Sequence, residues 1–482
     1  MIPSRDLLET ARVLSLEPRI VEKDYVLGWL LAAIYAQPEL AETWVFKGGT
    51  CLKKCYFETY RFSEDLDFTI TDPGQIDEPH LREVFTGVCE WTYDRSGIEA
   101  FPDRLRFEVY ADRRGSLSCE GRFYYRGPVS PRGDPPMIKL DLSSDELLAL
   151  EPVVREVNHP YADRPVEGIH ARCYAFEEIF AEKIRALGER CRPRDLYDVI
   201  HLYRRDDKDR AASQVHAVLE SKCQFKGIAA PTLDALAPYR EELATEWSNM
   251  LAHQLQFLPP MEEFWNQLSE VFRWLEGSTD RPALRSLSGQ AGETLLPREE
   301  ASLQAAQLNI GRSALESVFF AAANHLCIDL RYDNRTRRIE PYSLRRTREG
   351  HLLLYGCNAQ TGEIRSYRVD RIQDASVTGQ AFSPRFAVEL TDRGPSSAPP
   401  AARRPPIQAL PPTLSPGKRP RARRQQSRRA RGSTGTGPRY VYQCPMCGRR
   451  FTHTTRSASL RPHKNRQGSR CSGRRGTFVG IK

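Results

Sequence analysis

Two aspartates one residue apart constrain the fold of this chain more than any other feature. They close the segment "FKGGTCLKKCYFETYRFSEDLDFTI", residues 46–70. Alternation along a strand points Asp65 and Asp67 to one face, while Leu66 and Phe68 point into a core. Carboxylates so placed repel each other unless a cation lies between them. A hard divalent ion bound by oxygen is the obvious candidate, usually Mg²⁺ where phosphates share the site.

A glycine turn and a third aspartate extend this pattern. Gly48, Gly49 and Thr50 lead into a helix, which can place free backbone N–H groups and a hydroxyl against a phosphate, and Lys53 or Lys54 follows one turn later. The segment "IKLDLS" holds Asp141 between apolar residues, as Asp65 and Asp67 are held. Three strand carboxylates without a metal would be costly to desolvate. The pattern therefore predicts two magnesium ions that bind the phosphates of a nucleotide.

The order of "GGT", "DLD" and "KLDL" resembles the DNA polymerase β superfamily of nucleotidyltransferases. Over about residues 19–270 the chain resembles, more narrowly, the AbiEii/AbiGii toxin family of abortive-infection nucleotidyltransferases. Five separated segments carry this resemblance: "VEKDYVLGWLL", "FKGGTCLKKCYFETYRFSEDLDF", "IKLDLS", "EEIFAEKIRALGER" and "RDLYDVIHLYRR". It implies transfer of nucleotides from NTPs, in some members onto RNA 3′ ends, with growth arrest as the outcome.

The resemblance also implies roles for individual residues. The phosphate turn and its neighbours would bind the nucleotide: Gly48, Gly49, Thr50, Lys53, Arg61 and Ser63. The carboxylates Asp65 and Asp67 would bind both metal ions, and Asp141 the ion that activates the acceptor hydroxyl. In the helical part, Lys183 would neutralise the β- and γ-phosphates, and Asp198 matches the last acidic motif.

Three alternatives stay open in the helical part. Asp195 lies three residues before Asp198 on the same helix face, so either aspartate could be the acid of the motif. Arg194 and Asp198 could form an ordinary i,i+4 ion pair, and Lys183 could be a solvated helix lysine.

The length of 482 residues suggests about three domains of roughly 150 residues each. Apolar periodicity predicts an α/β (α+β) core over about 1–165 with a helical lobe over about 166–276, together the transferase. We expect the rest to comprise a linker at 277–300, a second unit at 301–392, a disordered basic linker at 393–439 and a small module at 440–482. The sequence shows no membrane span or signal peptide, and nine of its twelve cysteines are scattered singly, which indicates reduced thiols in a cytoplasmic protein.

The second unit resembles the WYL domain, an SH3-like small β-barrel, over about residues 325–390. Tyr332, "RRIEPYSL" and "RSYRVDRI" carry this resemblance, and "HLLLYG" departs from the namesake triplet. It implies sensing of nucleic acid or nucleotide ligands. Guanidinium groups suit phosphates and bases, so the candidate ligand residues are Arg338, Arg365, Arg368 and Arg371. Alternatively, these arginines lie on a solvated strand face or pair with Asp370 and Glu340.

The charge of the chain is strongly asymmetric. Of its 71 Lys and Arg, 22 lie in residues 393–482, which contain no Asp or Glu; residues 1–392 therefore keep 49 basic against 62 acidic residues. A basic arm on an acidic body predicts contact with a polyanion, most often nucleic acid. The alternative is that the arm aids solubility or docks on the acidic body.

The C-terminal module contains four residues spaced as zinc ligands: Cys444, Cys447, His463 and Cys471. With Phe451 and Leu460 as its only core, so small a module needs the metal to fold. It resembles a zinc finger of the Cys-Cys-His-Cys kind. His453 is a competing ligand, and free unordered cysteines are the alternative.

Together these features predict a cytoplasmic Mg²⁺-dependent nucleotidyltransferase with a structural Zn²⁺ site. It would transfer NMP onto RNA, including tRNA 3′ ends, as a toxin or in anti-phage defence, with an antitoxin or defence protein as partner. One alternative is synthesis of a short oligonucleotide, or labelling of a protein hydroxyl, from NTPs or dNTPs. Another is a nucleic-acid-binding regulator with an inactive transferase fold, which the intact Asp65, Asp67 and Asp141 argue against.

Overall fold

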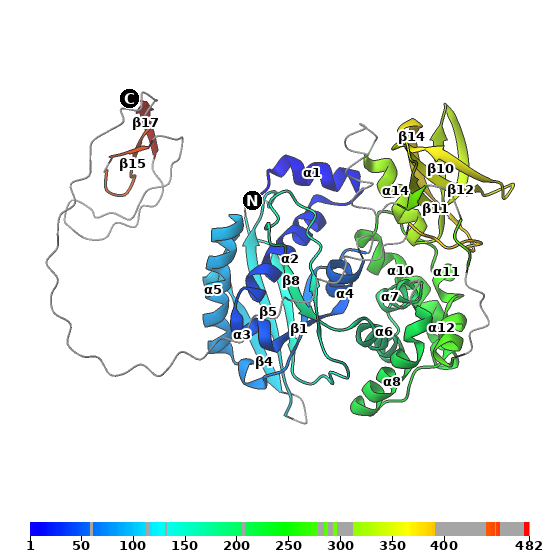
Figure 1. Cartoon of the computed structure of the whole chain (residues 1–482). Coiled ribbons are helices and arrows are strands. Elements are labelled where there is room, and N and C mark those ends of the chain that lie inside the picture. The colour runs from blue at the N-terminus through cyan, green and yellow to red at the C-terminus, as the bar shows by residue number, and fades with distance from the viewer. Residues whose placement is uncertain are drawn as a thin grey trace, which may run out of the picture. The chain divides into compact units, whose positions relative to one another are not determined.

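A computed structural model describes residues 1–57, 61–111, 115–130, 133–204, 208–277, 284–287, 293–295, 312–390, 440–448, 450–453 and 477–481. The chain forms two compact units, Met1–Arg404 and Pro405–Lys482 (Figure 1). The basic linker predicted for 393–439 lies outside the described residues, as does most of the linker predicted for 277–300.

The first unit is built on a mixed eight-stranded sheet. Its strands are β1 (Trp44–Lys47), β2 (Asp65–Ile70), β3 (Glu99–Ala100), β4 (Arg106–Ala111), β5 (Leu117–Arg126), β6 (Met137–Ser143), β7 (Val153–Glu156) and β8 (His170–Cys173). Their order is β3-β5-β6-β2-β1-β8-β7, with β4 paired to β5. The pairs β2–β6 and β1–β8 are parallel, and the other pairs are antiparallel. The expected mixed α/β core is therefore present.

Helices pack on this sheet through apolar side chains. They are α1 (Ser4–Val13), α2 (Pro18–Tyr35), α3 (Pro38–Thr43) and α5 (Glu78–Ser96). Helix α2 is buried on most of its surface because it contacts α1, α5 and β8. An aromatic cluster of Trp44, Phe46, Phe68 and Phe85 joins α5 to β1 and β2, with ring centroids 5.0 to 5.8 Å apart. These contacts bury one face of β2 and leave its aspartates on the other.

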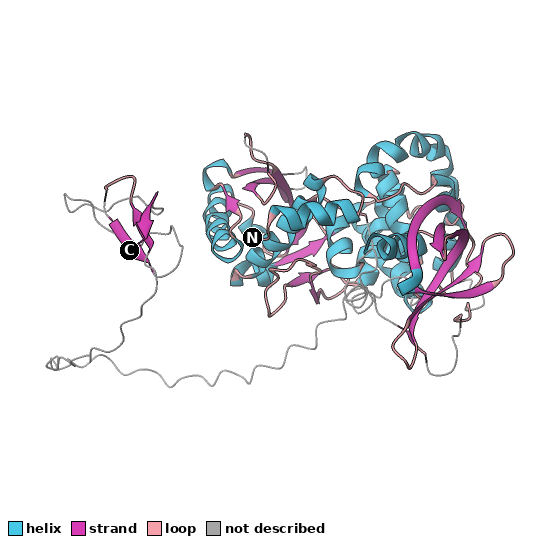
Figure 2. Cartoon of the chain, turned by 90° about the horizontal axis from the view of Figure 1, so that it is seen from above, coloured by secondary structure: helices cyan, strands magenta, loops and turns pink. Residues whose placement is uncertain are grey.

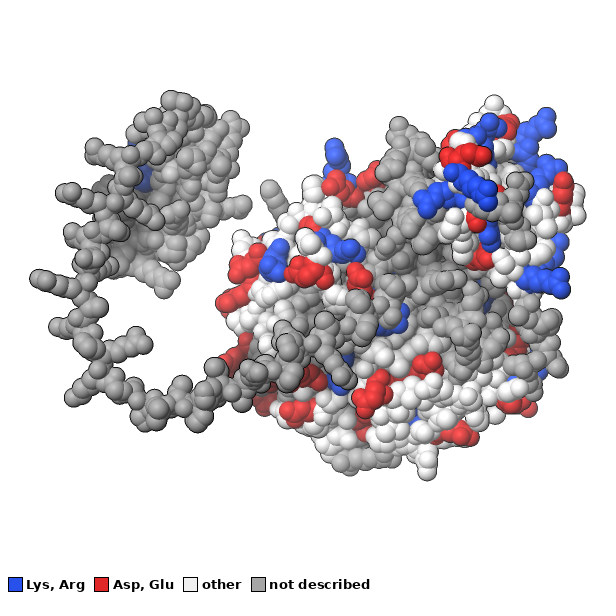
Figure 3. All heavy atoms as spheres, in the orientation of Figure 1, with Lys and Arg blue, Asp and Glu red and all other residues white. Residues whose placement is uncertain are grey.

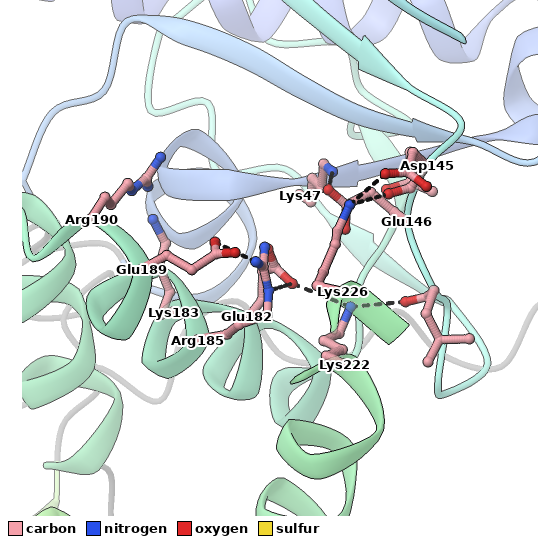
Figure 4. Close-up of polar contacts among 12 residues, drawn as sticks. Lys47, Asp145, Glu146, Glu182, Lys183, Arg185, Glu189, Arg190, Lys222 and Lys226 are labelled. Atoms are coloured by element: carbon pink, nitrogen blue, oxygen red, sulfur yellow. Dashed lines mark hydrogen bonds and ion pairs between the residues drawn. The ribbon is translucent and has the colours of Figure 1, made fainter. Parts of the chain in front are cut away.

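A helical lobe follows the sheet in the chain. It consists of α6 (Phe176–Arg190), α7 (Pro193–Tyr203), α8 (Lys208–Lys226), α9 (Leu233–Leu236), α10 (Arg240–Leu251), α11 (Met261–Trp265) and α12 (Leu268–Leu275). Ion pairs join this lobe to the segment after β6, where Lys226 lies 2.8 Å from Asp145 and Lys222 donates to the Leu147 carbonyl at 2.9 Å (Figure 4). Within the lobe, Lys222 lies 2.7 Å from Glu178, and both side chains are buried. The network holds α6 and α8 in one position relative to the sheet.

Among its described residues, the second part of this unit contains the helix α14 and a six-stranded antiparallel sheet (Figure 2). Its elements are α14 (Arg312–Ala323), β9 (Thr294–Leu295), β10 (Leu326–Tyr332), β11 (Arg335–Arg346), β12 (Leu352–Asn358), β13 (Ile364–Arg368) and β14 (Ile372–Ala381). The strand order is β13-β12-β11-β10-β14, with β9 on β11. Register shifts in the β10–β14 and β11–β12 pairs bend the sheet, yet β13 and β14 stay at opposite ends of it. The expected closed SH3-like barrel is therefore wrong for the described strands, which form an open sheet.

Helix α14 and the residues after it contact the helical lobe. The Asn324 side-chain oxygen accepts a hydrogen bond from the Tyr197 hydroxyl at 3.1 Å and lies 3.2 Å from His201 Nε2. Arg204 donates to the Ala323 carbonyl at 3.2 Å. Hydrogen bonds thus connect α7 and the residue after it directly to the end of α14.

The described residues of the second unit form a small antiparallel sheet of β15 (Tyr440–Gln443), β16 (Arg450–His453) and β17 (Thr477–Ile481), in the order β16-β15-β17. Throughout the described residues, no helix has the length and apolar character needed to cross a membrane.

Candidate active site

The three predicted carboxylates lie on adjacent parallel strands. Asp67 is the register partner of Asp141, and Asp65 is the partner of Lys139. Register partners in a parallel pair share a face, and so do residues two apart in a strand. All three aspartates are partly exposed, whereas the alternating Leu66 and Leu140 are buried. The strands therefore present three carboxylates on one face of the sheet.

The carboxylates are incompletely neutralised. Burial and, after it, the negative charge of Asp141 together raise the pKa of Asp67 to about 6. Burial also raises the pKa of Asp65. Asp141, 37% exposed, lies 3.0 Å from Lys139 Nζ, which also lies 3.2 Å from Glu120.

This donor set fits Mg²⁺. Carboxylate oxygen is the ligand type that Mg²⁺ binds, and a dication would relieve the repulsion that raises the pKa of Asp67. The ligand oxygens of the three aspartates do not all lie within 4.8 Å of one another in this structure. Side-chain rotation would therefore have to accompany metal binding.

The glycine turn lies against these carboxylates. It forms the short helix α4 (Gly48–Cys51), which continues as the π-helical turn η1 (Leu52–Tyr56). Gly48 has φ +80°, and a Cβ there would lie 2.1 Å from Asp67 Oδ2; a Cβ on Gly49 would lie 2.6 Å from Arg61 Nη2 and 3.2 Å from Ser63 Oγ. Glycine is thus required because the backbone approaches three side chains of the site.

Thr50 and the two lysines of the turn have different surroundings. The Thr50 hydroxyl donates to the Asp65 carbonyl oxygen, which ties the turn to β2. Lys54 is buried and lies 2.8 Å from Asp24 Oδ2. Lys53 is partly exposed, with Nζ 4.7 Å from the centroid of the Phe62 ring. Of the two lysines that the sequence left open, Lys54 is thus held in a buried ion pair, and Lys53 is the more exposed.

A buried ion pair joins the core to the lobe. Arg61 binds Asp198 of α7 through two hydrogen bonds, Nε to Oδ1 at 2.7 Å and Nη2 to Oδ2 at 2.8 Å, and the two side chains are 3% and 0% exposed. Lys183 of α6 lies 2.8 Å from Asp198 Oδ2 and is 8% exposed, so it is not a solvated lysine. Arg61 and Lys183 together hold the pKa of Asp198 well below its ordinary value despite the opposing effect of burial.

The neighbouring aspartate has a different partner. Asp195 binds Arg190 through two hydrogen bonds of 2.7 and 2.9 Å. Asp198 is therefore the acid that connects to Arg61 and the glycine turn, and Asp195 braces the end of α6.

Two cations near the carboxylates were not predicted as site residues; the sequence considered Arg194 only as an ion-pair partner of Asp198, which instead pairs with Arg61 and Lys183. Lys47 is the register partner of Asp67 and lies 3.3 Å from Glu146. Arg194 of α7 is half-buried, and its pKa is lowered by burial and by the positive charge of Arg61. The negative charges of Asp65, Glu64 and Asp198 oppose this lowering, so Arg194 lies within electrostatic reach of the carboxylate site. The sequence could have predicted Lys47 as a site residue, because it directly precedes the glycine turn. It could not have predicted Arg194, because the environment of that residue depends on how the lobe packs.

The four arginines of the second part lie on the surface of the open sheet. Three of them form ion pairs: Arg338 with Asp329, Arg365 with Glu363 and Arg368 with Asp370, at 2.6 to 2.8 Å. Arg371 is exposed. The predicted pairing with Asp370 is thus present, whereas Glu340 binds Arg385 at 2.8 Å.

Exposed ion pairs of this kind are weak, so these arginines stay open to exchange for an anionic ligand. Figure 3 shows further Lys and Arg side chains gathered over this part of the molecule.

Only part of the predicted zinc site lies within the described residues. Cys444 is buried behind Tyr442, Cys447 is partly exposed, and the Gly448 N–H donates to the Cys444 carbonyl at 2.9 Å. His463 and Cys471 lie outside the described residues, and so does the side chain of the competing His453. The zinc site stays a prediction.

Replacing Asp198 with Asn should destabilise the first unit by about 3 to 5 kcal/mol, because it leaves Arg61 and Lys183 buried without their carboxylate. Urea unfolding followed by circular dichroism measures the change. Arg122→Met is a matched control, since it removes a guanidinium from a partly exposed pair with Glu120 and should change stability by less than about 1 kcal/mol. Equal effects of the two substitutions would contradict this account.

Affinity for Mg²⁺ should fall as the pH drops below about 6, because protons then compete for Asp67. The raised pKa also means that the metal-free fold is less stable when Asp67 is ionised, so stability should fall as the pH rises through about 6. Asp67→Asn should therefore raise the melting temperature at about pH 7.5 without metal while weakening Mg²⁺ binding. Calorimetric titration measures Mg²⁺ affinity and thermal unfolding measures the melting temperature, with substitution of the exposed Asp103 by Asn as the control. A lower melting temperature for Asp67→Asn would contradict the prediction.

Comparisons with known proteins agree with the two resemblances seen in the sequence. The model of the family described as "Nucleotidyl transferase AbiEii toxin, Type IV TA system" matches residues 29–274. The model of the WYL domain matches residues 313–377. No curated protein sequence matches the chain.

Two solved structures are similar to parts of the chain. MenT4, a nucleotidyltransferase toxin from Mycobacterium tuberculosis H37Rv, is 20% identical, with a TM-score of 0.37, over 59% of this chain and 91% of its own. Proteasome accessory factor B/C (PafBC) of Arthrobacter aurescens is 14% identical, with a TM-score of 0.14, over 77% of this chain and 74% of its own. Since the AbiEii match spans just over half of its residues, the chain belongs to the AbiEii family of nucleotidyltransferase toxins and is a nucleotidyltransferase that also carries a WYL domain.

Proposed function

We propose that this nucleotidyltransferase transfers NMP from an NTP to the 3′ end of an RNA, with tRNA as the leading acceptor, as a toxin that acts in defence against phage. The observation that carries this proposal is the juxtaposition of three incompletely neutralised carboxylates on β2 and β6 with buried or half-buried cations from α6 and α7. Such a site suits a nucleoside triphosphate bound with Mg²⁺. NTPs and tRNA are cytoplasmic, so we place the reaction there.

The chain's own residues would orient the two reactants. The acceptor hydroxyl oxygen attacks the α-phosphorus, the bond from that phosphorus to the oxygen of the β-phosphate breaks, and pyrophosphate leaves. When bound by Asp65, Asp67 and Asp141, Mg²⁺ supplies neutralisation of the phosphate charge. The Asp141 side chain is exposed enough for the acceptor hydroxyl to approach it and to give it a proton.

The triphosphate would lie along the cations that face these carboxylates. Lys47 and Lys53 flank the glycine turn. Lys183 and Arg190 extend from α6 (Figure 4) and would have to share their charge between the triphosphate and their present partners, Asp198 and Asp195. Arg194 of α7 is the second residue that was not predicted for the site; it is half-buried and lies within electrostatic reach of Asp65. We propose that Arg194 binds the β- or γ-phosphate, where a guanidinium can form two hydrogen bonds.

A nucleic-acid acceptor is supported by the distribution of charge. The body that holds the active site is acidic, whereas residues 393–482 hold 22 basic residues and no acidic one. A basic arm of this kind would bring a polyanionic acceptor to a body that would otherwise repel it. A zinc site in residues 440–482 would fold the end of this arm.

The WYL domain would sense a nucleotide or nucleic-acid ligand and report it to the active site. Asn324, the residue that follows α14 of this domain, forms side-chain hydrogen bonds with Tyr197 and His201. Tyr197 directly precedes Asp198, the acid bound by Arg61. Movement of α14 on ligand binding would therefore shift the helix that carries Asp198 and Arg194.

Asp65→Asn should abolish transfer of labelled nucleotide while leaving the fold intact, because it removes a charge that metal binding needs and almost no volume. Incubation with each labelled NTP and dNTP, with and without total RNA or tRNA, measures the activity and identifies donor and acceptor together. The exposed Asp103→Asn variant is the matched control and should keep full activity.

The same assay separates the alternatives. Arg194→Gln should raise KM for the NTP more than it lowers kcat. Label on a short oligonucleotide or on protein, and none on RNA, would favour those acceptors instead. Full transfer by Asp65→Asn would overturn the catalytic assignment, and growth arrest by that variant would favour a binding regulator.

Nucleic-acid binding by the whole chain should weaken steeply with salt, because each neutralised phosphate adds a log–log slope of about −0.9 on duplex or about −0.7 on single strands. A chain that ends at Asp392 should lose most of that slope. Cys444→Ser with Cys447→Ser should release zinc and weaken binding only in part, since the preceding arginines need no metal. Fluorescence anisotropy over a salt series measures the slope; unchanged binding by the shortened chain would move the docking role to the WYL arginines.

A further inference from the structure

Three cysteines meet in the core beneath the glycine turn. Cys51 ends α4, Cys55 lies in η1, and Cys173 ends β8; all three are fully buried. Their sulfur atoms all lie within 4.8 Å of one another, and within the described part of the chain they are the only group of three His, Cys, Asp or Glu residues that meets this limit. The sequence reasoning treated them as scattered single thiols, so their meeting is a product of the fold.

Burial alone would not distinguish these cysteines, because free cysteine is commonly buried as a small apolar side chain. Two local features do. Cys55 lies in a π-helical turn, in which the Phe57 N–H donates to the Leu52 carbonyl at 2.8 Å, and such turns recur at functional sites. Arg155 brings a positive charge beside the cluster: its Nε donates to the Cys55 carbonyl at 2.8 Å, and its guanidinium lies 4.4 Å from the Tyr56 ring centroid.

Both the charge and the spacing suit a thiophilic metal ion. Three thiolates around a divalent ion carry one net negative charge, which the guanidinium of Arg155 would offset. Metal–sulfur bonds of about 2.3 Å place three ligand sulfurs roughly 3.8 to 4.0 Å apart, so the sulfurs need to close by less than about 1 Å. Thiolates select Zn²⁺ or Cu(I) over Mg²⁺.

We propose that Cys51, Cys55 and Cys173 form a thiolate site for a thiophilic d¹⁰ metal ion, Zn²⁺ or Cu(I). Three S–H bonds lose their protons to solvent, and three metal–sulfur bonds form without any change in oxidation state. Because the site is closed to solvent, the ion enters as the chain folds. It braces the segment from Gly48 to Tyr56 against β8, independently of the reaction at the carboxylates.

The full chain carrying Cys444→Ser and Cys447→Ser is the parent for the test, since it lacks two ligands of the predicted C-terminal zinc site. Elemental analysis of this parent, purified without chelator, should find one Zn or Cu per chain and shows which metal is bound. Refolding with Cd²⁺ should produce the ultraviolet thiolate-to-metal absorption band and raise the melting temperature. Adding Cys173→Ala to this parent should abolish the bound metal, the absorption band and the increase in melting temperature.

Cys119→Ala in the same parent is the matched control, because Cys119 is equally buried in β5 but lies outside the cluster; it should keep all three signals. If the Cys173→Ala protein does not fold, Cys51→Ala and Cys55→Ala provide the same comparison. A folded parent with neither bound metal nor a Cd²⁺ band would overturn the proposal. Metal retained at the parental level after loss of any one of the three cysteines would overturn it as well.

Discussion

The buried pair of Arg61 and Asp198 is the interaction on which the arrangement of this active site depends. Removing two charges from water is expensive, and their attraction offsets that cost only when geometry and further hydrogen bonds are good. Here the contact is bidentate, Gln254 accepts a further hydrogen bond from Arg61 at 3.0 Å, and Lys183 adds a second cation to Asp198. The pair therefore positions α6 and α7 against the start of β2, and the site exists only when core and lobe are joined.

The same pair places α7 between two functions. On one side of the helix, Asp198 holds the arginine that packs on the glycine turn; on another, Tyr197 and His201 contact Asn324 after α14. Helix α7 therefore contacts both the residue that follows α14 and the arginine beside the glycine turn. This link is short, because neighbouring residues of one helix make both contacts.

The segment from Lys47 to Tyr56 lies between two different sets of candidate metal ligands. Its first residues face hard oxygen ligands on β2 and β6, whereas Cys51 and Cys55 turn toward Cys173 behind it. Oxygen and thiolate ligands select different ions, so the two sets do not compete for one metal. Because Gly48 and Gly49 have no side chain, Asp67 and Arg61 can approach the backbone closely beside the oxygen ligands. The π-helical turn holds Cys55 in the thiolate set.

The sequence by itself determined the strand with two aspartates on one face, the glycine turn before it and the helices of the lobe. Those features depend on local alternation, helical periodicity and backbone freedom, which neighbouring residues set. The segment "AFEEIFAEKIRALGER", for example, is α6 almost residue for residue. The order of the motifs was also enough to recognise the AbiEii family and the WYL domain.

Only the tertiary structure decided which side chains are partners. It paired Lys54 with Asp24 and left Lys53 near the surface, connected Asp198 rather than Asp195 to Arg61, brought Arg194 toward the carboxylates and gathered three cysteines from two distant segments. It also left the WYL sheet open among the described strands, where the resemblance to the WYL domain implied an SH3-like small β-barrel. These outcomes depend on contacts between residues far apart in the chain. Local periodicity does not predict which buried charge or thiol will lie next to another.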